Sequence, residues 1–151
     1  MPATFAFLHH VAAFTMVAAL AVEMVLLKGE LDLTNARKLL RADMVYGLSA
    51  AAVLAIGLLR VFYFEKGAGY YFHSVPFLAK IALFAIVGIL SIYPTMKLAS
   101  WRTAVKQGLP PAVDPINLRT IRNIVHWQLV GVTLLIACAA LMARGIGYVG
   151  A

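Results

Sequence analysis

Four long apolar segments restrict what this chain can fold into. They cover residues 4–27, 42–64, 75–98 and 121–143, so that each is 23 or 24 residues long. A helix needs about 20 mostly apolar residues to cross the hydrocarbon core of a bilayer. The segments are too long and too rich in Ala, Leu and Met for barrel strands, which alternate over about ten residues. The sequence therefore predicts an all-α integral membrane protein with four transmembrane helices.

The composition agrees with this fold class. Of the 151 residues, 63% are hydrophobic and 13% are charged, whereas soluble domains average roughly half and a quarter. The same balance excludes a disordered chain. The one cysteine, Cys138, excludes an internal disulfide and a CxxC motif. Residues 1–8 contain no Lys or Arg, so we expect the first segment to be retained as a helix rather than to be a signal peptide. The length fits a single domain, residues 1–151.

The basic residues predict the orientation of the helices. Nine lie beside the first and third loops: Lys28, Arg37, Lys38, Arg41, Lys97, Arg102, Lys106, Arg119 and Arg122. Only Arg60, Lys66 and Arg144 lie on the other side. Because cytoplasmic loops carry the excess of Lys and Arg, we expect both termini on the outer, periplasmic side of a bacterial inner membrane. The partner indicated is the lipid bilayer rather than a nucleic acid, and the short loops favour an up-down-up-down four-helix bundle.

Ionisable groups inside a span are costly and point to functional sites. His9, Met16 and Glu23 are spaced by sevens and so share one helix face, which we expect to point into the bundle. Arg60 and Arg144 are expected to reach the headgroups. The segment that begins at Asn35 has the pattern of a short amphipathic helix on the inner surface, ahead of the second span.

The four histidines, His9, His10, His73 and His126, are candidate haem ligands because neutral imidazole binds haem iron well. Ligation by two histidines requires imidazoles at a similar depth on different helices. His73 meets this condition with His9 or with His10 on the outer side. His126 lies nearer the cytoplasmic side and needs another type of ligand or a residue from a second copy. Alternatively, these histidines only form interfacial hydrogen bonds.

Cations near the histidines suit the two propionates of a haem. Lys80 lies five residues into the third span, and Arg119 and Arg122 precede His126. The alternatives are that Lys80 extends to the surface and that the arginines form interfacial salt bridges. Glu23, Asp43 and His126 could instead form a proton relay. Small residues between Gly47 and Gly57 permit close helix packing, either within the bundle or in a homodimer.

The chain resembles the small membrane protoporphyrinogen oxidases of the HemJ type. The resemblance lies in RADMVYGLSAAAVLAIGL of the second span, the pair Leu8–His9, PFLAKIAL of the third span and LRTIRNIVHWQLVGV of the fourth. It implies haem b bound by His9 or His10, with Lys80 near the porphyrin. The first span ends in AVEMVLLKGE rather than in the aromatic–Leu–Pro–Arg stretch of that family, and His73 is seven residues from Lys80. In length and layout the chain also resembles a family of small four-span bacterial membrane proteins.

The sequence therefore gives three hypotheses. The first is a homodimeric, b-type cytochrome-like protein that transfers electrons with a quinone or a redox protein. Its haem b would be bound by His9 or His10 together with His73, with His126 at a further site and Lys80, Arg119 and Arg122 beside the propionates. The second is a HemJ-like protoporphyrinogen oxidase. The third is a small proton-coupled transporter.

Overall fold

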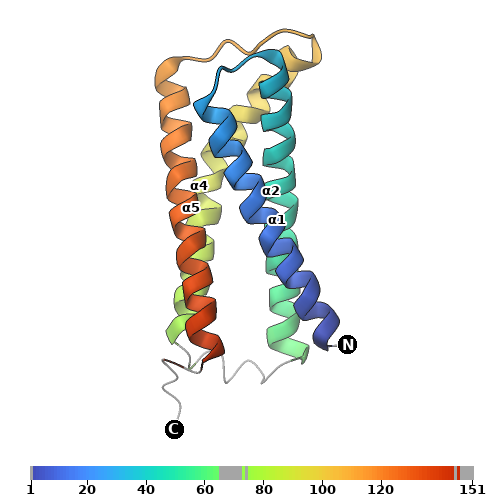
Figure 1. The fold of residues 1–151 in the computed structure, drawn as a ribbon, viewed down its shortest axis with the longest axis vertical. Coiled ribbons are helices and arrows are strands. Elements are labelled where there is room, and N and C mark those ends of the chain that lie inside the picture. The colour runs from blue at the N-terminus through green and yellow to red at the C-terminus, as the bar shows by residue number, and fades with distance from the viewer. Residues whose placement is uncertain (1, 65–72, 74, 145, 147–151) are drawn as a thin grey trace.

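The computed structural model describes residues 2–64, 73, 75–144 and 146. Its long helices are α1 (Pro2–Lys28), α2 (Leu33–Leu59), α4 (Val75–Lys106) and α5 (Pro115–Ala143), and a π-helical turn, η1 (Arg60–Phe64), continues α2. The helices run alternately up and down one long axis, as Figure 1 shows. We call the end where α1 begins and α5 stops the terminal end, and the end with residues 29–32 and 107–114 the loop end.

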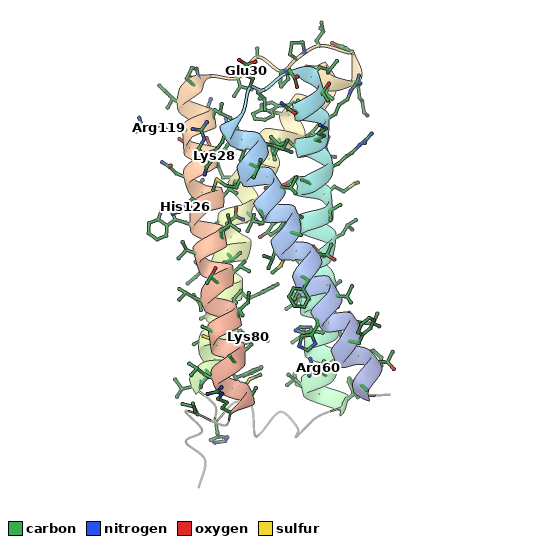
Figure 2. The ribbon with its side chains drawn as sticks, viewed as in Figure 1. Lys28, Glu30, Arg60, Lys80, Arg119 and His126 are labelled. Carbon is green, nitrogen blue, oxygen red and sulfur yellow. The ribbon has the colours of Figure 1, made fainter. Side chains whose placement is uncertain are left out.

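All four long helices are long and apolar enough to cross a membrane, which confirms the predicted all-α, four-span architecture. The basic residues Lys28 and Arg119 lie toward the loop end (Figure 2). Lys66, which entered the prediction of orientation, lies outside the described residues.

The helices extend beyond the apolar segments because capping residues set their ends. The carboxylate Oδ1 of Asp32 accepts a hydrogen bond of 2.6 Å from the backbone N–H of Asn35, which satisfies a donor of the first turn of α2. The prediction of a separate amphipathic helix after Asn35 is therefore wrong, because α2 is continuous from Leu33. Asp114 caps α5 in the same way, through the N–H of Ile116.

The bundle is closed by four neighbouring helix pairs. α1 packs on α2 and α5, and α4 packs on α5 and α2, so that the order around the axis is α1, α2, α4, α5. Fully buried side chains from all four helices form the core, among them Leu20, Leu39, Leu98 and Ile121. Many large apolar side chains point outward, with Phe14 on α1 72% exposed. Outward apolar faces suit contact with acyl chains rather than water.

Candidate functional site

Polar residues gather at two levels of the bundle, and the first is a small cavity near the terminal end. This terminal cavity has a volume of about 90 Å³ and is lined by residues of α1, α2, η1, α4 and α5. Its polar lining consists of His9, Arg60 and Lys80, and its apolar lining includes Phe77 and Phe84. Three elements, α1, η1 and α4, thus bring an imidazole and two cations to one place.

His9 reaches the cavity because of the residue opposite it on α2. A Cβ atom placed on Gly57 would lie 3.2 Å from Cε1 of His9, so glycine leaves room for the imidazole against the backbone of α2. Farther along the same face of α1, Met16 and Glu23 are buried. The expectation that the His9–Met16–Glu23 face points into the bundle is confirmed.

Arg60 and Lys80 come to this cavity from opposite sides. Arg60 begins the π-helical turn at the end of α2, and π-helical turns are frequent at functional sites. Lys80 lies in the second turn of α4. Figure 2 shows both residues toward the terminal end, on different helix pairs. Arg60, which was expected to reach the headgroups, also lines this cavity.

The other three histidines are not among the residues that line this cavity. His10 is exposed, and its Nδ1 is hydrogen-bonded to the carbonyl oxygen of Ala6 at 2.6 Å. His73 is exposed, two residues before α4, and it is not among the residues that line the terminal cavity. His126 is exposed on the outer flank of α5 (Figure 2), with its ring centroid 6.1 Å from that of Trp127. Of the four candidate ligands, His9 is the one that the structure places in the described cavity.

The two arginines of α5 lie toward the opposite end from His9. Arg119 is exposed. Arg122 donates two hydrogen bonds, of 3.2 and 2.8 Å, to the carbonyl oxygen of Leu27. The last carbonyls of a helix have no intrahelical donor, so Arg122 closes the end of α1. This position gives Arg122 a structural role and separates both arginines from the terminal cavity.

The second level is a polar cluster inside the core, closer to the loop end. The core polar cluster consists of Glu23, Asp43, Tyr46, Thr95 and Gln128. Glu23, Asp43 and Gln128 are 2%, 4% and 1% exposed. Thr95 Oγ1 donates to Asp43 Oδ1 at 2.7 Å, and Gln128 Nε2 donates to the Tyr46 hydroxyl at 3.2 Å. The second of these bonds crosses the bundle from α5 to α2.

Two buried oxygens of this cluster, Oε1 of Glu23 and Oε1 of Gln128, have no hydrogen-bond partner in the described part of the chain. Buried polar atoms are nearly always paired, with a protein group, a water or an ion, so these two oxygens are acceptors available to such a group inside the core. Glu23 and Asp43 were predicted from the sequence as candidate functional residues, whereas Gln128 was not. The available signal was an amide side chain in an otherwise apolar part of the fourth span.

Comparison with known proteins places the chain in a family. No curated protein matches it, and no solved structure matches it. A family model described as "Predicted membrane protein (DUF2214)" matches residues 1–147, which is nearly the whole chain and includes all four spans and both polar levels. The chain therefore belongs to this family of membrane proteins.

Proposed function

We propose that the bundle binds haem b at the terminal cavity and carries single electrons within the membrane. The observation that supports the proposal is the meeting of His9, Arg60 and Lys80 around one cavity. The imidazole of His9 would bind the haem iron. The ammonium and guanidinium groups suit two propionates. The resemblance of the Leu8–His9 pair and of the segment around Lys80 to HemJ-type oxidases agrees with this assignment.

The side chains of the terminal cavity suit haem, but the volume of the cavity is small for a ligand of this size. A cavity of about 90 Å³ is below the roughly 300 Å³ at which small-molecule sites begin. Haem binding at this place would therefore require the helices around the cavity to move apart. The α1–α2 and α4–α5 pairs already diverge toward the terminal end (Figure 1). Haem, when bound, supplies a one-electron redox couple.

Absorption spectra of the detergent-purified protein test the proposal. In oxidised and dithionite-reduced states, protein from haem-replete cells should show a Soret band and a sharp reduced α band, with haem b in a pyridine haemochrome assay. His9→Ala should lose the haem. His10→Ala is the matched control, because the imidazole of His10 is exposed and hydrogen-bonded to its own helix. This variant should keep the haem. His73→Ala asks whether this residue supplies the second axial ligand.

A colourless wild-type protein, or full haem content in His9→Ala, would contradict haem binding at this site. If haem is present, two redox roles remain, electron transfer and HemJ-like protoporphyrinogen oxidation. Complementation of a strain that lacks its own protoporphyrinogen oxidase distinguishes them, because growth would favour the HemJ-like activity. A bacterial inner-membrane location, a homodimer and a quinone or redox-protein partner stay predictions from the sequence.

The core polar cluster supports a second candidate function, proton-coupled transport. Acidic side chains inside a membrane bundle are typical of proton pathways. Glu23 and Asp43 are both buried and interact electrostatically with each other, and Oε1 of Glu23 has no hydrogen-bond partner among the residues that the structure describes. The relay expected from the sequence also included His126, which the structure places on the outer flank of α5. The pathway proposed here therefore runs through Glu23 and Asp43 without it.

Proteoliposomes test this candidate. An imposed pH gradient should drive proton flux, measured with an entrapped pH-sensitive dye, and Glu23→Gln should abolish the flux because an amide does not exchange the proton. Glu30→Gln is the matched control, since Glu30 is exposed at the loop end, and it should leave the flux unchanged. Equal flux in both variants would exclude Glu23 from the pathway.

A further inference from the structure

A cleft between α2 and α4 lies beside the core polar cluster. Its volume is about 530 Å³, within the range of roughly 300–1,000 Å³ typical of small-molecule sites. It extends from Phe84, which it shares with the terminal cavity, to Arg102 near the loop end. No histidine is among its described lining residues, so its chemistry differs from that of the proposed haem site.

The floor of this cleft is polar. Asp43 and Tyr46 are buried at its base, and the Asp43 carboxylate accepts the hydrogen bond from Thr95. The guanidinium of Arg102, which also lines the cleft, attracts Asp43 electrostatically. The floor thus offers both hydrogen-bond acceptors and donors at a fixed position inside a largely apolar bundle.

The walls of the cleft leave space for a flat group. A Cβ atom placed on Gly47 of α2 or on Gly88 of α4 would meet no atom within 4 Å. The side chains along its open edge are apolar and exposed, and they include Leu48, Ile92 and Met96. In a bilayer such an edge faces acyl chains, so an apolar tail can leave the cleft directly into the lipid.

We propose that this cleft binds the ring of a membrane quinone. A planar ring fits between the two glycine walls, while its apolar tail leaves over the exposed edge. In the reduced form the ring hydroxyls donate to the Asp43 carboxylate and to the Thr95 oxygen, whose own proton is donated to Asp43. Asp43 and Arg102, the two charged side chains of the lining, have opposite signs and attract each other, so the cleft has no net charge to offer an anionic headgroup and favours a neutral ring with hydroxyl or carbonyl groups. The inference goes beyond the proposed haem site and does not require it.

Isothermal titration calorimetry of the detergent-purified protein tests this proposal. The probe is decylubiquinone, a quinone ring with a short alkyl tail, in its oxidised and reduced forms. Gly88→Leu fills the cleft from a position with open space and should weaken binding at least about tenfold. Ala85→Leu is the matched control, because Ala85 is exposed on the same helix and is not part of the cleft lining, and it should bind as the wild type does.

A second variant and a second ligand examine the polar floor. Thr95→Val keeps the shape of the side chain, removes its hydroxyl and should weaken binding by about tenfold. Decanol, which carries an alkyl tail without a ring, should not displace the quinone. Absent binding, unchanged binding in Gly88→Leu, or displacement by decanol or an anionic phospholipid would each overturn the proposal. Binding by the His9→Ala variant should equal that of the wild type, which separates this test from the haem proposal.

Discussion

At the scale of single residues, the glycines of this bundle differ in the space that surrounds them. A Cβ atom on Gly131 of α5 would lie only 2.6 Å from Cγ2 of Val87, whereas one on Gly47 or Gly88 would meet nothing. Gly131 therefore sets the approach of α5 to α4, while the other two border the cleft. The small residues from Gly47 to Gly57 were predicted to permit close packing, either within the bundle or in a homodimer. Within one copy of the chain, Gly57 packs against His9, whereas a Cβ atom on Gly47 would meet no atom within 4 Å.

The environments of these glycines predict opposite effects of the same substitution. Gly131→Ala should destabilise the protein by about 1–3 kcal/mol, because overpacking forces the β-branched Val87 or its helix to move. Gly47→Ala should be neutral or stabilising by up to about 1 kcal/mol, because alanine favours the helix over glycine. Thermal unfolding in detergent, followed by circular dichroism, checks both. A lower midpoint for Gly47→Ala than for Gly131→Ala would contradict the assigned environments.

Single residues also show where the sequence was informative about the candidate sites. Heptad spacing placed His9 and Glu23 on one inward face, and both are at the polar levels of the bundle. Gln128 was missed because a lone amide has no partner in the sequence. Its partner, the Tyr46 hydroxyl, lies 82 positions away. That Arg60 lines the terminal cavity could not be predicted either, because a position near a span end does not reveal the direction of the side chain.

At the scale of the helices, hydropathy located the middle of each element, and local capping determined its ends. α2 starts nine residues before the predicted span, at Leu33, because Asp32 caps it. α4 continues through basic residues to Lys106, eight residues beyond its apolar segment. Helical hydrogen bonding does not require apolar side chains, so a helix continues past the hydrocarbon until a cap or a breaking residue stops it.

At the scale of the whole molecule, the bundle has one strongly basic end. The nine cations counted from the sequence lie on or beside the helix ends that adjoin residues 29–32 and 107–114. The positive-inside rule predicts that this loop end is cytoplasmic. The terminal cavity would then open toward the periplasmic half of the membrane, and the quinone cleft would lie in the cytoplasmic half.

Labelling of introduced cysteines tests this orientation. In a Cys138→Ser background, Thr4→Cys at the terminal end should react with a membrane-impermeant maleimide in intact bacterial cells. Glu30→Cys at the loop end should react only after lysis. Both positions are exposed, so access to the reagent, rather than burial, decides the result. The reverse pattern would show that the basic end faces outward.

The sequence by itself determined that this is a four-span helical membrane protein and that the His9–Glu23 face of α1 points inward. Only the tertiary structure decided that His9 shares a cavity with Arg60 and Lys80, that His126 points outward and that α2 and α4 enclose a cleft. The physical reason is that lipid is as apolar as the core. Apolar residues therefore surround each helix, and their pattern leaves the rotation of a helix toward its neighbours undetermined.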